Sequence, residues 1–387
     1  MNLALSNDPP QQNGYLDLKV IYRGARHEVL RGRRKLDNEK VVIKVLLNSN
    51  PVASEIAALE REFELLKLLK SLNLKGCLQV VALERVGNKL ALIAADAGPV
   101  NLEQFLKQGA LELSLFFELA IALAESVESI HKAGLIHLDL CPANIVLNHS
   151  SQPTAATIVD FGAATASNPN IKQTDPVAAP SLEGMAYHSP EQTGRMQQPL
   201  EHLSDLYSLG AIFYEMLTGQ PPFVFDDPLE LVHAHLSCSP LPPHQLNKAV
   251  PEFLSAIVLK LLTKKPEDRY QSAYGLAQDL FRLGQGHELS APIGSFELGL
   301  DDSPHGLNIP TRLYGRENEV EALVAAFNRV TDHGSAELLL VSGYSGIGKS
   351  TLVRELYKPL VQEQGFFLTG KFDQYRANVP FSTTTQA

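Results

Sequence analysis

The chain has 387 residues, a length typical of two to three domains, and its 44% hydrophobic and 20% charged residues are ordinary for a globular protein. A net charge of −10 argues against a protein that binds the phosphate backbone of nucleic acids, which usually requires a basic face. The N-terminus lacks the features of a signal peptide, and no apolar run reaches the roughly 18 residues of a membrane span. Three widely spaced cysteines form no metal-ligand pattern and no disulfide framework, which favours a reducing, cytoplasmic setting.

The first third of the chain predicts a disordered start over 1–13, then an antiparallel sheet with one helix. The helix is expected over 54–71, where apolar residues recur at helical spacing. The strand-like and apolar segments around it are residues 18–22, 28–30, 40–46, 78–84 and 89–95.

From about Leu102 the chain predicts mostly helices. The segment 204–217 is apolar on nearly all sides, which is typical of a buried helix. Residues 286–312 hold Gly, Pro, Ser and acidic residues without periodicity and are expected to be a linker. The predicted helices of this part are residues 115–132, 204–217, 251–262 and 272–283.

A new pattern follows the linker. A helix is expected over 316–330, a strand over 337–342, a glycine-rich loop, a helix over 350–360 and a strand over 366–368. This order predicts the opening of a βαβ unit.

The segment Gly134–Leu147 contains candidate catalytic residues. It reads as a loop between two apolar runs, with His137-x-Asp139-x-x-x-x-Asn144 at its centre. Phosphoryl transfer needs a carboxylate to orient the attacking hydroxyl and take its proton, and an amide oxygen to hold a metal ion. Asp139 and Asn144 can do both, and Asp160, which follows a strand-like segment, can hold Mg²⁺ against ATP phosphates.

These residues, with Val41-Val-Ile-Lys44, resemble the motifs of eukaryotic-type serine/threonine protein kinases, whose loop reads H-R-D-x-K-P-x-N. The resemblance implies an α+β, bilobal protein-kinase-like fold over 14–285, with ATP and Mg²⁺ as cofactors and proteins bearing Ser or Thr as substrates. It also implies roles for single residues: Asp139 as catalytic base, Asn144 and Asp160 as metal ligands, Lys44 on the α/β-phosphates, and Glu62 as the partner of Lys44. Glu60 and Glu64 are competing choices for that partner.

Several positions depart from the family pattern. Of the glycine-rich loop G-x-G-x-x-G-x-V only Gly24 and Val29 remain, and Arg26 could replace backbone donors with a side-chain charge. Leu138 stands where the family has Arg, so we expect that phosphorylation of the activation segment is not the switch. Cys141 stands where the family has Lys, and losing a cation there can cost about 10²–10³ in rate.

Cys141 has a second interpretation as a reactive thiol near a nucleotide site, although cysteines of cytoplasmic chains are more often inert. Downstream residues resemble architectural parts of the kinase family. Asp205 is expected to brace the catalytic loop, and Arg269 is expected to pair with Glu191 at the end of the activation segment.

The segment Gly343–Ser350 fits G-x-x-x-x-G-K-[ST] in full, after an apolar segment and before a helix. Backbone N–H groups of such a loop cradle phosphates at a helix N-terminus. Lys349 is expected on the β/γ-phosphates and Ser350 on Mg²⁺. The residues expected to bind nucleotide here are Gly343, Gly346, Gly348, Lys349, Ser350 and Thr351.

The stretch 313–320 resembles the entry of AAA/STAND-type ATPases. No Walker B carboxylate is visible downstream, which predicts an incomplete P-loop ATPase domain over 313–387 and a chain that stops inside a domain. The order of kinase, linker and P-loop resembles the N-terminal part of bacterial signalling proteins that join a serine/threonine kinase, an ATPase and a sensor histidine kinase. Downstream signalling modules of a larger protein are therefore expected partners.

Three hypotheses stay open. The chain is an active serine/threonine protein kinase, or a degenerate kinase that binds nucleotide or a partner as a regulatory module. A P-loop signalling ATPase with the kinase lobe as sensor is disfavoured by the missing Walker B carboxylate.

Overall fold

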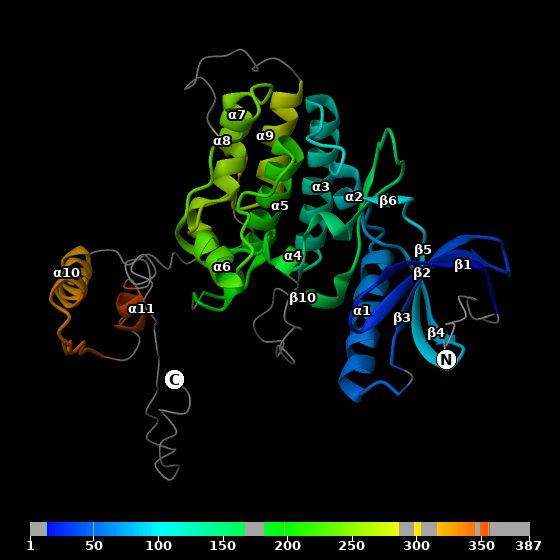
Figure 1. The fold of residues 1–387 in the computed structure, drawn as a ribbon, viewed down its shortest axis with the longest axis horizontal. Coiled ribbons are helices and arrows are strands. Elements are labelled where there is room, and N and C mark those ends of the chain that lie inside the picture. Colours follow the sequence, from blue (N-terminus) through cyan, green and yellow to red (C-terminus); the bar gives the residue numbers. More distant parts are fainter. Residues whose placement is uncertain are drawn as a thin grey trace, which may run out of the picture.

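The computed structural model describes residues 14–48, 50–166, 182–196, 198–285, 298–302, 316–344, 349–354 and 356. Between Gly14 and Gln285 the chain forms two lobes, a small one with a sheet and helix α1, and a larger one of packed helices (Figure 1). The predicted bilobal α+β arrangement is confirmed.

The small lobe contains a five-stranded antiparallel sheet in the order β1-β2-β3-β5-β4. Alternate residues of β3, such as Val41, Ile43 and Val45, are at most 1% exposed, as the period of two requires for a half-buried strand. The strands are β1 (Tyr15–Arg23), β2 (His27–Arg34), β3 (Lys40–Leu46), β4 (Val80–Val86) and β5 (Lys89–Ala95).

Helix α1 (Ala53–Ser71) packs on β4 and β5. Its buried residues Leu59, Leu66 and Leu69 lie on one face, and Glu62 lies on that face as well. The only acidic residue of the buried face is therefore presented to the interior between the lobes.

The large lobe is built around α5 (His202–Thr218), which is buried along almost its whole length, as its apolar pattern predicts. Helices α3 (Leu113–Lys132) and α8 (Glu252–Leu261) pack against it, and α9 (Ala273–Gly284) packs against α3 and α8. The remaining helices are α2 (Leu102–Leu106), α4 (Leu182–Met185), α6 (Pro228–Ser237) and α7 (Pro243–Leu246).

Two small sheets fix the ends of the catalytic loop. One pairs its strands in the order β6-β8-β9, and the other pairs β7 with β10. The loop leaves β7, and the Asp160 turn leaves β9, so both are held at the junction of the lobes. The strands are β6 (Val100–Asn101), β7 (Leu135–Ile136), β8 (Ile145–Leu147), β9 (Ala156–Ile158) and β10 (Thr165–Ala166).

Residues 298–302, within the predicted linker, contact the helical lobe. Asp302 accepts hydrogen bonds from the backbone nitrogens of Gln271 (2.7 Å) and Ser272 (2.8 Å) at the start of α9. The Gly299 nitrogen donates to Asp279 Oδ2 at 2.8 Å. This short segment is therefore hydrogen-bonded to the start and the middle of α9.

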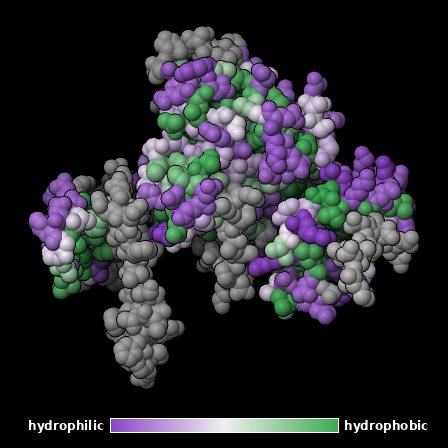
Figure 2. All heavy atoms as spheres, in the orientation of Figure 1, coloured by the Kyte–Doolittle hydropathy of each residue, from purple (hydrophilic) through white to green (hydrophobic). Residues whose placement is uncertain are grey.

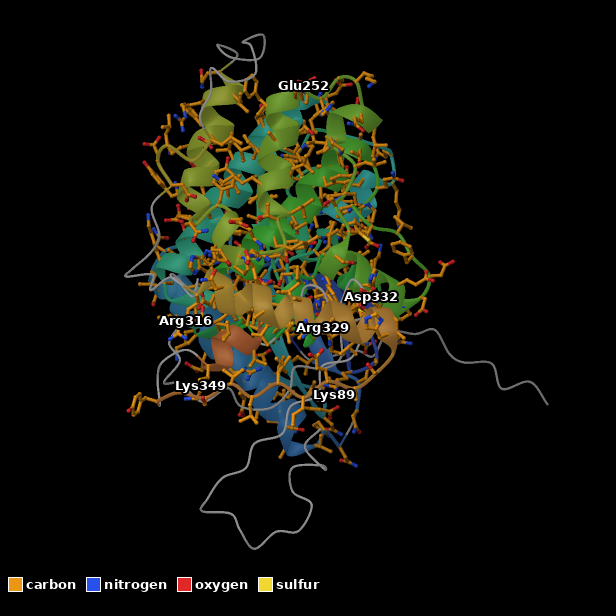
Figure 3. The ribbon with its side chains drawn as sticks, turned by 90° about the vertical axis from the view of Figure 1, so that its left-hand side faces the viewer. Lys89, Glu252, Arg316, Arg329, Asp332 and Lys349 are labelled. Carbon is orange, nitrogen blue, oxygen red and sulfur yellow. The ribbon has the colours of Figure 1, made fainter. Side chains whose placement is uncertain are left out.

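The C-terminal part forms α10 (Glu317–His333) and α11 (Lys349–Arg354), which contact each other. Charged side chains lie along α10, and Lys349 begins α11 (Figure 3). The predicted strand over 337–342 is wrong, because residues 335–344 are irregular. Leu338 and Leu340 are 88% and 87% exposed, and among the described residues after 316 no strand lies beside this stretch to pair with its backbone.

Hydrophilic and hydrophobic residues are interspersed over the face drawn in Figure 2. None of the helices in the described ranges is long and apolar enough to cross a bilayer. The predicted segments 1–13 and 366–368 lie outside the described residues.

Candidate active site

Lys44 connects three elements at the junction of the lobes. Its Nζ donates to both carboxylate oxygens of Glu62, at 3.1 and 2.9 Å, and to Asp160 Oδ1 at 2.8 Å. The side chain of Lys44 is 15% exposed and that of Glu62 is 4% exposed. The expected partner is thus Glu62 rather than Glu60 or Glu64, and the same ammonium group also holds Asp160.

Lys44 and Asp160 stabilise each other's charged form. Burial opposes the charge of Lys44, but the carboxylates of Asp160 and Glu62 outweigh it and raise the pKa of Lys44. Burial likewise works against ionised Asp160, but the charge of Lys44 and its hydrogen bond hold the pKa of Asp160 below its usual range. Lys44 is therefore a cation beside an ionised Asp160 at neutral pH.

Asp160 stands in a left-handed backbone conformation, with φ of 61°. Its Oδ1 accepts a hydrogen bond from the Gly162 nitrogen at 3.3 Å, which closes the turn. A Cβ on residue 162 would lie 3.2 Å from that oxygen, so glycine lets the backbone approach the carboxylate closely.

Asp205 stabilises the backbone of the loop that carries Asp139. This buried carboxylate accepts from the backbone nitrogens of His137 and Leu138, both at 2.8 Å, and contacts His131 Nε2 at 2.9 Å. Leu138 has a φ of 62°, a conformation that costs energy for a residue with a Cβ. The expected bracing by Asp205 is confirmed, and it holds the strained turn immediately before Asp139.

Asp139 and Asn144 contact each other directly. Asn144 Nδ2 donates to Asp139 Oδ2 at 3.0 Å and to the Asp139 carbonyl at 2.9 Å. The amide oxygen of Asn144 is then the atom that can face a cation. The Val159 nitrogen donates to the Asn144 carbonyl at 2.9 Å, which ties this loop to the turn that carries Asp160.

These residues fit a magnesium ion. Mg²⁺ prefers oxygen ligands and is usually bound by one or two carboxylates plus substrate phosphates. Asp160 and Asn144 offer such oxygens, and the described ranges contain no group of three or more His, Cys, Asp or Glu that would form an all-protein metal site.

The glycine-rich loop differs from the expectation. Val29 lies opposite Lys44 in the β2–β3 pairing, and the Gly24 nitrogen donates to the His27 carbonyl at 2.9 Å. His27 is electrostatically coupled to the site: burial and the charge of Lys44 lower its pKa, against the opposing effect of Asp160. A largely uncharged imidazole at neutral pH therefore faces the lysine that is expected to bind phosphates.

Cys141 is buried, and burial together with the charge of Asp139 raises its pKa to about 12. The thiol is therefore protonated at neutral pH, which argues against the reactive-thiolate interpretation. It brings no charge to the position where the kinase motif has Lys.

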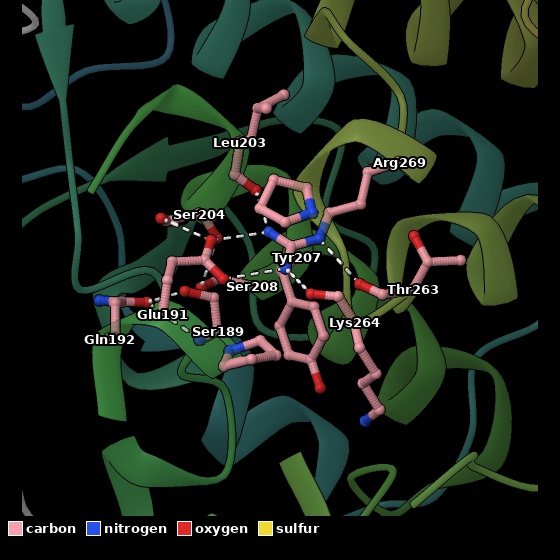
Figure 4. A network of polar contacts seen from close by, with 12 residues as sticks. Ser189, Glu191, Gln192, Leu203, Ser204, Tyr207, Ser208, Thr263, Lys264 and Arg269 are labelled. Atoms are coloured by element: carbon pink, nitrogen blue, oxygen red, sulfur yellow. Dashed lines mark hydrogen bonds and ion pairs between the residues drawn. The ribbon is translucent and has the colours of Figure 1, made fainter. Parts of the chain in front are cut away.

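Glu191 and Arg269 form a buried ion pair under the end of the activation segment (Figure 4). Arg269 donates to both oxygens of Glu191, at 2.7 and 2.9 Å, and Ser204 Oγ donates to the same carboxylate at 2.8 Å. Burial opposes ionised Glu191, but the hydrogen bonds and charge of Arg269 lower its pKa overall. The predicted pair is present.

Two residues near Asp139 belong to none of the motifs recognised in the sequence. His188 Nε2 lies 3.9 Å from Asp139 Oδ1, and Gln192 Nε2 donates to the Leu138 carbonyl at 2.7 Å. Both are about 50 residues downstream of the loop that they contact, and only the expected place of Glu191 at the end of an activation segment indicated that this stretch returns to the site.

The second nucleotide-binding segment is described in part. Lys349 Nζ donates to the carbonyls of Gly343 and Tyr344, both at 2.7 Å, so its side chain turns back over the start of the loop. Gly346 and Gly348 lie outside the described residues, and so do the side chains of Ser350 and Thr351.

A sheet-bearing lobe, a helical lobe, and a Lys–Glu–Asp cluster beside an Asp–Asn loop at their junction define the protein kinase class of fold. Residues 15–281 match the protein kinase domain family, and the chain belongs to that family. Residues 312–387 match the AAA ATPase domain family.

Similar proteins include both kinases and a hybrid signalling protein. The chain is 32% identical to hybrid signal transduction histidine kinase G of Dictyostelium discoideum over 395 positions, covering 78% of this chain and 11% of that protein. It is 37% identical to serine/threonine-protein kinase PknB of Mycobacterium leprae over 218 positions, covering 56% of this chain and 32% of that protein. With PknB of Mycobacterium tuberculosis it shares 39% identity over 165 positions, 42% of this chain and 25% of that protein.

The chain thus spans 11–32% of the length of these relatives. A protein kinase domain joined to an AAA ATPase domain, as the sequence motifs predict, is confirmed.

Proposed function

We propose that this chain is an active, ATP-dependent serine/threonine protein kinase of signal transduction. The observation that carries the proposal is the contact of Lys44 with both Glu62 and Asp160, beside the hydrogen-bonded pair of Asp139 and Asn144. A kinase needs the lysine paired with its helical glutamate and the turn aspartate directed into the site, and both conditions hold.

Each residue has a role in the transfer of the γ-phosphate of ATP to a protein hydroxyl. Lys44, held by Glu62, binds the α/β-phosphates, and Asp139 orients the Ser or Thr hydroxyl and accepts its proton. Asn144 and Asp160 would hold Mg²⁺, which when bound neutralises charge on the phosphates.

The relatives support the choice of Ser or Thr as acceptor, because two of them are named as serine/threonine-protein kinases. We further propose that residues 313–387 belong to a P-loop domain in which Lys349 and the backbone of its loop bind nucleotide phosphates. The match to the AAA ATPase domain family supports this assignment.

The alternative is a degenerate kinase that senses nucleotide or a partner. It is favoured by the uncharged Cys141 beside Asp139, where the kinase motif has a cation. The two functions differ in one measurable property, which is phosphate transfer.

The test is transfer of labelled γ-phosphate from Mg-ATP to the chain and to a generic basic protein, followed by identification of the phosphorylated amino acids. Native protein and a Lys349→Ala variant are expected to yield phosphoserine or phosphothreonine equally, and an Asp139→Asn variant is expected to yield neither. Nucleotide binding without transfer in the native protein would instead support the regulatory module, and loss of transfer with Lys349→Ala would place the chemistry in the P-loop.

A further inference from the structure

The site has a gap in its positive charge. Cys141 occupies the position where the kinase motif carries Lys, and its buried thiol is uncharged. Lys44 is committed to Glu62 and Asp160, so its ammonium group does not compensate on the Asp139 side. The catalytic loop, residues 134–147, contains no Lys or Arg to place beside the carboxylate that orients the substrate hydroxyl.

His188 lies beside this carboxylate. Its Nε2 is 3.9 Å from Asp139 Oδ1, whereas Asp139 Oδ2 accepts from Asn144 Nδ2 at 3.0 Å. The two carboxylate oxygens are thus divided between an amide donor and an imidazole. The side chain of His188 is only 15% exposed and that of Asp139 is 35% exposed, so solvent screens this contact only in part.

The backbone around His188 is held in place from both sides. On one side, the Tyr187 hydroxyl donates to Glu215 Oε2 at 2.6 Å. On the other side, the Ser189 nitrogen donates to Gln192 Oε1 at 3.0 Å, and Gln192 Nε2 donates to the Leu138 carbonyl at 2.7 Å. The imidazole is therefore carried by a segment fastened directly to the residue before Asp139.

We propose that His188 is a positioning residue for phosphoryl transfer, and that its imidazole, a side chain able to carry positive charge, holds Asp139 in place of the lysine absent at Cys141. This inference rests on the proposed kinase function. In the step that it serves, the substrate O–H bond breaks and the proton moves to Asp139. The substrate oxygen forms its bond to the γ-phosphorus, and the bond from that phosphorus to the leaving oxygen breaks, with the electron pair staying on ADP.

The expected contribution of His188 depends on charge rather than on shape. His188→Gln keeps a polar side chain of similar size but cannot carry a positive charge, and we expect it to lower kcat by roughly 10–100-fold, below the loss typical of a direct transition-state donor. The KM for ATP should stay within about threefold, because His188 acts through Asp139 and not on the nucleotide. His188→Lys, which places a cation at this position, should retain at least about a third of the native kcat.

The Cys141→Lys substitution is expected to restore the kcat lost in His188→Gln. In that background we expect His188→Gln to cost less than about threefold in kcat, since the charge now comes from the catalytic loop. The matched control is His149→Gln, at an exposed histidine in the turn between β8 and β9, which should leave kcat unchanged. Thermal unfolding of every variant shows whether Lys at the buried position 141 is accepted, and His188→Lys tests the same charge if it is not.

The inference is overturned if His188→Gln leaves kcat within about twofold of native, or if His188→Lys loses as much as His188→Gln. It is also overturned if His188→Gln lowers kcat by the same factor in the native protein and in a folded Cys141→Lys variant. If neither the native protein nor Cys141→Lys transfers phosphate, the proposed kinase function fails and the role of His188 falls with it. A native kinase indifferent to His188 refutes only the inference.

Discussion

The buried pair of Glu191 and Arg269 gives the most direct prediction about stability. Replacing Arg269 by Met removes a guanidinium group that is fully buried, with 0% of its side chain exposed. It also removes hydrogen bonds to the carbonyls of Leu203 (2.9 Å), Thr263 (2.9 Å) and Lys264 (3.0 Å). Glu191, 1% exposed, would then be a buried carboxylate that keeps the Ser204 hydroxyl as a donor but has lost its paired cation.

The magnitude follows from the desolvated charge that is left behind. Removing one partner of a buried ion pair typically costs about 3–5 kcal/mol of unfolding free energy, because the other charge stays buried without compensation. For a domain of this size that loss lowers the melting temperature by roughly 6–20 °C. Removing both charges, with Arg269→Met and Glu191→Leu together, should cost less than Arg269→Met alone, since no uncompensated charge remains.

The assay is urea unfolding of the whole chain followed by far-UV circular dichroism, because the chain contains no Trp for a fluorescence signal. Arg23→Met is the matched control, since Arg23 pairs with Glu28 at 2.8 Å but is 66% exposed, and it should cost only about 0.2–1 kcal/mol. A loss for Arg269→Met no larger than for Arg23→Met, or a double variant less stable than Arg269→Met, would refute the reasoning.

Three further predictions concern stability and its dependence on pH. Asp302→Ala should lower the unfolding free energy by about 0.5–2 kcal/mol, because Asp302 accepts three hydrogen bonds at the start of α9, and an unchanged urea midpoint would contradict this. Burial lowers the pKa of Lys264 to about 7, so above pH 7 the unfolded state binds more protons than the folded state. The stability of native protein relative to Lys264→Met should therefore rise between pH 7 and 10, and a flat difference would count against it. Burial opposes the ionised form of Asp205, but the hydrogen bond of His131 lowers the pKa of Asp205 overall. Ionised Asp205 therefore stabilises the folded state above the unfolded-state pKa of about 3.9, and this stabilisation is lost as the pH falls below that value. The advantage of native protein over Asp205→Asn should shrink between about pH 5 and 3, and an advantage that grows would refute the sign.

The sequence predicts those parts of the fold that follow from local pattern. Strand β3 is found over the expected residues, and α1 begins one residue before its expected start. The choice of Glu62 over Glu60 and Glu64 also has a local cause, because Glu62 shares the buried face of α1 with Leu59 and Leu66. Periodicity alone is enough to single it out.

Contacts between distant segments are less accessible from the sequence. Lys44 and Asp160 are 116 positions apart, and their contact could be expected only through the kinase resemblance. The proximity of His188 to Asp139 follows from no motif, because it depends on how the activation segment folds back. The strand expected over 337–342 fails for a related reason, since an apolar run forms a strand only where another strand pairs with it.

The central claim is that Asp139 acts as the base in phosphate transfer from ATP. The measurement that tests it most directly is a single-turnover transfer rate with saturating Mg-ATP, for native protein and for Asp139→Asn, with the ATP affinity of both determined by calorimetry. We expect equal affinities within a few-fold and a rate about 10²–10⁴ lower for Asp139→Asn. Equal transfer rates for the two proteins, or ATP binding without transfer by native protein, would contradict the account.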